Sequence, residues 1–168
     1  MVGAVVAVPS LRLLYFENTS PAADLTIKVT GKMWSWTYEY PDHGITFDSI
    51  MVPEADLKEG QPRLLTVDRE VVVPVNKNVI VGLKSNDVIH DWALPAFGVK
   101  LDAVPGRLQT TWFRAEREGI YYGQCSELCG RNHAFMPIAV RVVSEAEFAD
   151  WLAKTKPAAS LDTGKVAT

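Results

Sequence analysis

Two cysteines, a histidine and a methionine lie within one short stretch that can bind a transition metal. These residues are Cys125, Cys129, His133 and Met136. Thiolate and thioether sulfurs are soft ligands, and two thiolates combined with an imidazole and a weak thioether favour copper over zinc or an iron–sulfur cluster. The stretch therefore predicts a copper–thiolate site.

The second cysteine indicates more than one copper ion. A mononuclear blue-copper site needs one cysteine, two histidines and a long axial methionine or carbonyl. Cys129, His133 and Met136 would supply it with one further histidine. Cys125 is then surplus, and a thiolate four residues from the first can bridge two copper ions. We therefore expect a binuclear centre that shares both sulfurs.

The second imidazole must come from elsewhere, and only His43 and His90 remain in the chain. His90 lies in the apolar stretch 87–94, which is typical of the end of a buried strand. His43 lies among Pro, Asp and Gly residues, which are typical of a solvated turn. We expect His90 to be the ligand and His43 to be a turn residue.

A disulfide is the alternative for two closely spaced cysteines in an exported protein. A bond between Cys125 and Cys129 would close only a small loop, so it would stabilise the fold little. The nearby histidine and methionine favour the metal instead. For Met136 alone the alternative is core packing, a common use of methionine.

Composition sets the size of the domain and excludes one class of partner. The chain has 168 residues, of which 48% are hydrophobic, enough for one domain with its own core. Its net charge is −3, which argues against nucleic acid, because proteins that bind it usually carry a basic patch. An acidic face would attract a basic partner.

The middle of the chain predicts one all-β domain over residues 25–156. Short β-rich runs separated by Gly, Pro and Asn are typical of a sandwich or barrel. They cover residues 25–30, 33–40, 45–52, 64–67, 71–75, 79–83, 88–94, 110–115, 119–123 and 136–143. The ligand stretch lies between the last two, so a rigid scaffold would hold it. A capping-box sequence at 144–147 predicts a short C-terminal helix ending near residue 154.

The two ends of the chain differ from this domain. Residues 2–16 are mostly apolar but would span only about 22 Å as a helix, against about 30 Å for a bilayer core. We expect residues 1–16 to be the remaining end of a transmembrane helix, with a short amphipathic helix as the alternative. Residues 17–24 predict a linker and residues 157–168 a disordered tail.

Aromatic residues alternate along residues 33–40, at Trp34, Trp36, Tyr38 and Tyr40. One interpretation places all four on a single core face, as strand periodicity requires. The other places one tryptophan at the surface, where a redox partner docks and electrons enter through the ring. Periodicity alone does not choose between them.

Together these residues resemble the copper-binding domain of subunit II of cytochrome c oxidase. The resemblance covers most of the chain: residues 9–15, 34–40, 47–49, 103–107 and 121–124, and the motif C-x-E-x-C-x-x-x-H-x-x-M at 125–136 with a histidine 35 residues upstream of it. That motif is highly specific. The family usually has two membrane helices before this domain, so we expect the chain to be a fragment.

The resemblance implies a cupredoxin-like Greek-key β-barrel or sandwich that holds a CuA centre. It implies six ligands to this binuclear copper: Cys125 and Cys129 as bridges, His90 and His133 on one ion each, Met136 as a weak axial ligand and the carbonyl of Glu127 as the other. It also implies that the Glu127 carboxylate helps to hold Mg or Mn at the contact with subunit I, since such hard ions take few carboxylates. A solvated loop carboxylate is the alternative.

The family's function implies how the remaining residues act. Trp34 matches the tryptophan through which electrons enter from cytochrome c, although Ser35 departs from a common aromatic at that position. We expect four acidic residues to attract a basic cytochrome c and to speed association in a salt-dependent way: Glu39, Asp42, Asp48 and Asp87. Each has a plain surface role as its alternative.

The expected function is electron transfer from cytochrome c through the copper pair to haem in subunit I, where oxygen is reduced. The expected partners are therefore cytochrome c, subunit I, other oxidase subunits and the membrane. The domain would face the bacterial periplasm or the mitochondrial intermembrane space. Three alternatives remain: the electron-entry domain of nitrous oxide reductase, a copper-delivery module, and an exported domain with a disulfide and no metal.

Overall fold

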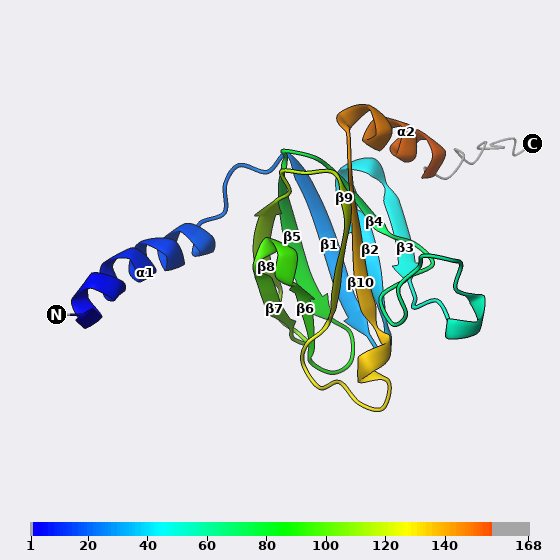
Figure 1. Cartoon of the computed structure of the whole chain (residues 1–168), viewed down its shortest axis with the longest axis horizontal. Coiled ribbons are helices and arrows are strands. Elements are labelled where there is room, and N and C mark those ends of the chain that lie inside the picture. The colour runs from blue at the N-terminus through cyan, green and yellow to red at the C-terminus, as the bar shows by residue number, and fades with distance from the viewer. Residues whose placement is uncertain (1, 156–168) are drawn as a thin grey trace, which may run out of the picture.

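Two five-stranded sheets pack face to face in the computed structural model, which describes residues 2–155 (Figure 1). The first sheet has the order β3-β2-β1-β5-β8, with β1 at Leu25–Lys32, β2 at Ser35–Tyr40, β3 at Ile45–Ser49, β5 at Asn78–Ser85 and β8 at Gln109–Arg114. The second has the order β4-β10-β9-β6-β7, with β4 at Val71–Pro74, β6 at His90–Leu94, β7 at Val99–Ala103, β9 at Gly119–Cys125 and β10 at Pro137–Val143. The prediction of an all-β sandwich is confirmed.

Long connections that cross between the sheets give the sandwich its topology. β1 pairs in parallel with β5, and β10 pairs in parallel with β4. The other strand pairs are antiparallel. The chain leaves the second sheet through β9 and returns through β10, so the β9–β10 loop projects from one end of the sandwich, at the bottom of Figure 1.

The aromatic alternation places its residues as a strand requires, with one exception. Trp36, Tyr38 and Tyr40 of β2 are buried, while Trp34 lies just before the strand and is half-buried. The Tyr40 hydroxyl donates to the carbonyl of Val72 and accepts from its N–H, both at 2.9 Å. Burial raises the pKa of Tyr38 and of Tyr40. The alternation therefore serves the core, and Trp34 alone among the four reaches the surface.

The structure lacks one expected β segment and contains one strand that was not expected. Residues 64–67 are a loop joined to the preceding segment only by an isolated bridge between Met51 and Val67, because residues 50–70 form a long connection with one short 3₁₀ turn, η2 (Glu54–Asp56). Strand β7 was not expected. It is a sheet edge with alternating burial over five residues, and its polar half hides the apolar pattern.

The C-terminal helix α2 spans Glu145–Thr155 and begins at the predicted capping box. The Ser144 hydroxyl accepts from the N–H of Glu147 at 3.2 Å, and the Glu147 carboxylate accepts from the N–H of Ser144 at 3.2 Å. Trp151 then packs on Tyr40, with 5.1 Å between ring centroids. Helix α2 therefore closes the end of the sandwich opposite the β9–β10 loop (Figure 1). The predicted tail at 157–168 lies outside the described residues.

The N-terminal helix α1 spans Val2–Asn18 and is exposed along its whole length. Its last turn contacts the domain at β8, where the rings of Phe16 and Trp112 lie 5.5 Å apart and the Trp112 indole N–H donates to the carbonyl of Glu17 at 3.1 Å. Within residues 2–155, no helix has both the length and the apolar character needed to cross a bilayer.

Candidate metal centre

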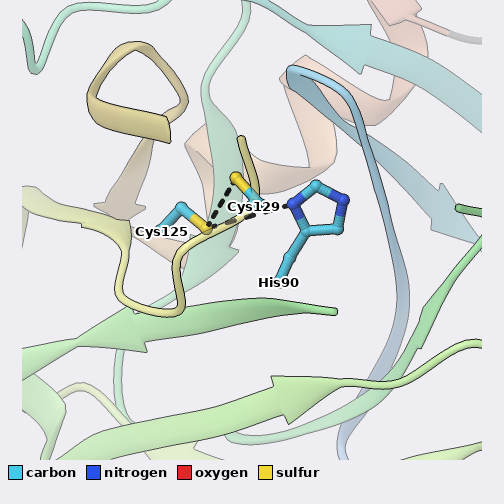
Figure 2. A group of neighbouring side chains, drawn as sticks. All are labelled: His90, Cys125 and Cys129. Carbon is cyan, nitrogen blue, oxygen red and sulfur yellow. Dashed lines mark hydrogen bonds between the residues drawn. The ribbon is translucent and has the colours of Figure 1, made fainter. Parts of the chain in front are cut away.

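The predicted ligands meet at one end of the second sheet, where β6 begins and β9 ends (Figure 2). His90 is the first residue of β6 and Cys125 the last of β9, and the pairing of Trp92 with Cys125 brings the two strands together. Gly123 of β9 lies so close to β6 that a Cβ there would overlap the carbonyl oxygen of Ala93. Neighbouring strands thus position two ligands that lie far apart in the chain.

The donor atoms of this centre converge on the two sulfurs. The Sγ atoms of Cys125 and Cys129 lie 3.7 Å apart, and both cysteines are free. Three donors lie around them: His90 Nδ1 is 4.0 Å from Cys125 Sγ, His133 Nδ1 is 3.5 Å from Cys129 Sγ, and Met136 Sδ is 3.7 Å from Cys129 Sγ. His90, both cysteines and Met136 are buried. Two imidazoles, two thiolates and a thioether therefore surround one small region.

This spacing fits a shared metal. Thiolate–metal bonds of about 2.3 Å allow two sulfurs on one ion to lie at most about 4.6 Å apart, and the observed separation is 3.7 Å. A disulfide would need about 2.05 Å. The carbonyl oxygen of Glu127 lies 3.4 Å from Cys125 Sγ, which makes a sixth donor available. The residues present thus match the soft, mixed sulfur and nitrogen set that copper favours.

Local backbone contacts hold the ligand loop, residues 126–135, in shape. The N–H of Cys125 donates to the carbonyl of Met136 at 3.2 Å, which ties the two ends of the loop together. Gly130 has a backbone φ angle of +116°, a value that residues other than glycine rarely adopt. The N–H of His133 donates to the carbonyl of Gly130 at 3.2 Å and starts the 3₁₀ turn η4 (His133–Phe135). The loop is short and closed by its own hydrogen bonds.

Two contacts fix the ring of His90. Its Nε2 lies 2.8 Å from Asp87 Oδ1, and a carboxylate can only accept, so Nε2 carries the proton and the neutral ring offers the lone pair of Nδ1 to Cys125. Gly31 of β1 lies against the ring, where an added Cβ would come within 2.8 Å of His90 Cδ2. The structure leaves no room there for any residue larger than glycine.

The two thiols have very different proton affinities. Burial would raise the pKa of Cys125, but hydrogen bonds with His90 and with the backbone outweigh it and lower this pKa to about 7. Burial and the neighbouring Cys125 thiolate raise the pKa of Cys129 to about 12. Burial would lower the pKa of His90, but hydrogen bonds with Cys125 and Asp87 outweigh it and raise this pKa. Without metal, Cys125 therefore loses its proton at a much lower pH than Cys129 does.

Residues 25–143 match the family described as cytochrome c oxidase subunit II, periplasmic domain. The chain belongs to the cytochrome c oxidase subunit II family. The resemblance stated from the sequence is therefore confirmed.

Relatives within the subunit II family cover nearly the whole chain. A probable cytochrome c oxidase subunit 2 of Rickettsia bellii is 52% identical over 97% of this chain and 61% of its own length. A cytochrome c oxidase subunit 2 of Cereibacter sphaeroides is 52% identical over 88% of this chain and 54% of its own length. The chain thus spans little more than half the length of these relatives.

A solved structure also matches the fold. The crystal structure of the periplasmic domain of subunit II of cytochrome oxidase (CoxB) of Bradyrhizobium japonicum is 59% identical, with a TM-score of 0.77, and the match covers 82% of this chain and 97% of that one. This likeness confirms the predicted cupredoxin-like fold. Membership in the family, with the His and Cys cluster of the structure, also agrees with the predicted CuA copper.

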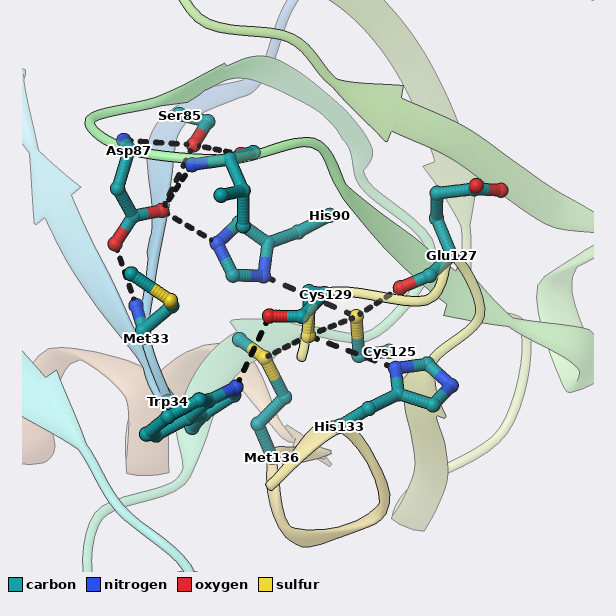
Figure 3. A network of polar contacts seen from close by, with 11 residues as sticks. Met33, Trp34, Ser85, Asp87, His90, Cys125, Glu127, Cys129, His133 and Met136 are labelled. Atoms are coloured by element: carbon teal, nitrogen blue, oxygen red, sulfur yellow. Dashed lines mark hydrogen bonds and ion pairs between the residues drawn. The ribbon is translucent and has the colours of Figure 1, made fainter. Parts of the chain in front are cut away.

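Trp34 contacts the centre directly. Its indole N–H donates to the carbonyl of Cys129 at 3.2 Å, and its ring lies against Gly130, where an added Cβ would be 3.2 Å from it (Figure 3). The ring is half-buried. The structure therefore brings Trp34 together with the predicted ligands, as the second interpretation of the aromatic strand requires.

The four acidic residues predicted to dock cytochrome c do not share one setting. Asp48 accepts from the hydroxyl of Thr37 at 2.6 Å and from Lys32 at 3.0 Å. Asp87 lies at the metal centre, whereas Glu39 lies near the end of β2 that is farther from Trp34. Asp42 lies in the 3₁₀ turn η1 (Pro41–His43), the turn predicted around His43, where the His43 ring lies 6.1 Å from that of Phe148 in α2. Their docking role stays a prediction.

Three supporting residues were not predicted. Gly31 gives no signal in the sequence, since its role depends on β1 passing His90. Asp87 was predicted only as a docking charge, although its position three residues before His90 could have suggested a partner for that ring. Asp91 is buried, and its carboxylate accepts a hydrogen bond from Lys100 Nζ at 2.9 Å. Its backbone carbonyl accepts a hydrogen bond from the N–H of Ser126 at 3.2 Å. It fixes the start of the ligand loop.

Proposed function

We propose that this chain is the electron-accepting domain of a cytochrome c oxidase, with a binuclear CuA centre between cytochrome c and the haem of subunit I. The observation that carries the proposal is the convergence of two free thiols and two imidazole Nδ1 atoms on one buried region, with Sγ–Sγ at 3.7 Å. Membership in the subunit II family supports an oxidase over a nitrous oxide reductase.

The ligands named for the family are those that the structure brings together. The copper would be held by the thiolates of Cys125 and Cys129, the imidazoles of His90 and His133, the Met136 thioether and the Glu127 carbonyl. Copper held in this way supplies a one-electron redox couple. Because strand ends and a loop tied at both ends position the donors, they move little when the charge of the centre changes, which keeps the barrier to electron transfer small.

Trp34 is the proposed entry point for electrons. Its ring reaches from the surface to the carbonyl of a bridging cysteine, so it supplies a short covalent and hydrogen-bonded route from a docked cytochrome c. Glu39, Asp42 and Asp48 are proposed to attract the basic partner at long range. Such charges act mainly on the association rate.

Copper titration of the reduced chain tests the centre. Two copper ions per chain should produce intense visible thiolate-to-copper bands and electron-spin hyperfine structure from two equivalent nuclei. Cys125→Ser should abolish this signature, because one bridging sulfur is lost. One copper per chain, or a colourless product, would contradict the binuclear proposal and favour the copper-delivery or disulfide alternatives.

Stopped-flow reduction by cytochrome c tests the entry point. Trp34→Phe should slow electron transfer to the loaded centre by an order of magnitude or more, because the ring loses its hydrogen bond to Cys129. Trp112→Phe is the matched control, since Trp112 is also partly exposed and donates its indole N–H to a backbone carbonyl. Equal rates in the two variants would rule out Trp34 as the entry point.

Glu127 is proposed to serve two metals with different atoms. Its carbonyl faces Cys125, while its exposed side chain extends away from the sulfurs (Figure 3). The carboxylate is therefore free to bind Mg or Mn at the contact with subunit I. In the assembled oxidase, Glu127→Gln should weaken Mn binding, measured by its spin signal, and leave the copper spectrum intact. Retention of Mn would contradict this role.

The proposed location is the outer side of an energy-transducing membrane, in the bacterial periplasm or the mitochondrial intermembrane space. Helix α1 supports an anchoring role, because its exposed residues are largely apolar over its full length. In the full-length subunit, charged residues placed at Val5 and Val6 should reduce recovery in the membrane fraction. Unchanged recovery would contradict the anchor.

A further inference from the structure

We infer that Asp87 is a positioning residue that sets the orientation of His90 and, at the same time, the position of the loop that carries Trp34. The inference rests on the proposed function, in which His90 binds copper and electrons enter at Trp34. It adds a second role to the predicted one of Asp87 as a surface charge for docking.

The two oxygens of Asp87 face two different parts of the site. Oδ1 lies 2.8 Å from Nε2 of His90, and Oδ2 accepts from the N–H of Met33 at 2.7 Å (Figure 3). Met33 directly precedes Trp34, in the connection between β1 and β2. One side chain therefore joins the connection before β6, where His90 begins the strand, to the connection before β2.

Asp87 is itself held in a fixed conformation. Its Oδ1 accepts from the N–H of Val88 at 2.7 Å and lies 3.3 Å from the hydroxyl of Ser85. Its own N–H donates to the Ser85 hydroxyl at 3.2 Å, and the residue Ser85 is buried. The side chain of Asp87 is only 25% exposed. These contacts leave the carboxylate of Asp87 little freedom to move.

The chemistry of a carboxylate explains why aspartate suits this place. A carboxylate has acceptor sites only, so it can accept hydrogen bonds from the Nε2–H of His90 and from the N–H of Met33 at the same time. The bond to Nε2 leaves Nδ1 of the neutral ring unprotonated, as a ligand requires. No neutral side chain of similar size can accept on both sides.

A second contact connects Trp34 to the metal centre. While Asp87 holds the backbone before Trp34, the carbonyl of Cys129 holds its ring. His90 and Cys129 are both proposed copper ligands. The positions of Trp34 and of the proposed ligands therefore depend on each other. Removing the hydrogen bonds of Asp87 should disturb both.

Asp87→Asn is the decisive variant, because asparagine has the same size but one acceptor oxygen. If its oxygen faces Met33, its NH₂ group faces Nε2 of His90 and favours the tautomer that carries the proton on Nδ1. If its oxygen faces His90, its NH₂ group opposes the N–H of Met33. Asp87→Glu keeps the charge but displaces it by one CH₂ group. Asp56→Asn is the control, since it removes one charge from the exposed 3₁₀ turn η2, which has no part in the proposed site.

Two measurements use the metal-free chain. The ring ¹⁵N shifts of His90, recorded where the ring is neutral, should show Nε2–H in the unaltered chain and a shift toward Nδ1–H in Asp87→Asn. Amide exchange at Met33 and Trp34 should accelerate in Asp87→Asn and in Asp87→Glu. Neither readout should change in Asp56→Asn. Copper affinity should fall by about 10- to 100-fold in Asp87→Asn, the usual loss for the partner of a ligating histidine.

The opposite results are equally clear. If Asp87→Asn keeps the ring tautomer and amide exchange of the control, the positioning role is overturned, even when the unaltered chain binds two copper ions. If Asp87→Glu matches the unaltered chain in all readouts, the negative charge alone suffices and the positioning role is overturned. Failure of the proposed function shows separately, as absent copper bands in the unaltered chain, and the metal-free readouts still decide the role of Asp87.

Discussion

Replacing Gly31 with alanine should disturb the metal centre from the side of the first sheet. The added Cβ would lie 2.8 Å from His90 Cδ2, 3.1 Å from His90 Cγ and 3.1 Å from the ring of Trp36. Carbon atoms in contact prefer about 3.5–4.0 Å, so the ring of His90 must move by about 0.7–1.2 Å. Ligand distances tolerate only about 0.2 Å. We expect a changed copper spectrum and an affinity lower by about tenfold or more.

The stability of the metal-free chain should fall as well. Overpacking a core costs about 1–3 kcal/mol, and the lower entropy of the unfolded alanine chain offsets about 0.4–1 kcal/mol of this. The expected net loss in the free energy of unfolding is about 1–2 kcal/mol, measured by urea denaturation without metal. Copper titration followed by visible absorption gives the affinity.

Gly82→Ala is the matched control for Gly31→Ala. Gly82 lies in β5, which pairs with β1, and an added Cβ would meet only Leu108 at 3.7 Å and Lys28 at 4.0 Å. Both are ordinary contacts, so this variant should keep the copper spectrum and gain about 0.4–1 kcal/mol in the free energy of unfolding. If Gly31→Ala behaved like Gly82→Ala in both assays, the reasoning that β1 fixes the His90 ring would be refuted.

Three further predictions concern the core, the helix cap and the protons of the centre. Tyr40→Phe leaves the buried N–H and carbonyl of Val72 without their partner, so urea denaturation should show a loss of about 1–3 kcal/mol with an unchanged copper spectrum; equal stability would contradict the pairing. Ser144→Ala removes the cap of α2 and should cost about 1 kcal/mol, with full stability as the contrary outcome. Copper binding should release at least one proton at pH 8, from Cys129, and at least two at pH 6, where Cys125 is also protonated. Affinity should therefore weaken as pH falls, and calorimetry in buffers of different ionisation enthalpy should detect the protons; no release at pH 8 would contradict the assignment.

The convergence of the candidate ligands was predictable because most of them are rare residue types. Only two cysteines and three histidines occur in the chain, so the choice of His90 over His43 needed only the contrast between a buried strand and a turn. The period of two in β2 also predicted its buried face, since Trp36, Tyr38 and Tyr40 follow it. Local patterns of this kind carry information about fold and about metal chemistry alike.

What escaped prediction depends on contacts between distant segments. The role of Gly31 requires β1 to pass against His90, and no local pattern encodes that approach. Asp87 looks like any surface acid until Met33, 54 residues away, is placed beside it. Strand β7 escaped because an exposed edge strand lacks a continuous apolar face. These three features depend on tertiary contacts, which the sequence does not show locally. The candidate ligands could be recognised from residue type and spacing alone.

The close approach of Gly123 to Ala93 bears on how metal ions exchange at the centre. Since no side chain separates β9 from β6 there, the strand side forms an immobile wall behind Cys125. The opposite side is the ligand loop, whose Leu128 is 78% exposed. Ions must therefore arrive and depart through that loop, and the exchange rate should follow substitutions within it while remaining indifferent to changes in the strands behind.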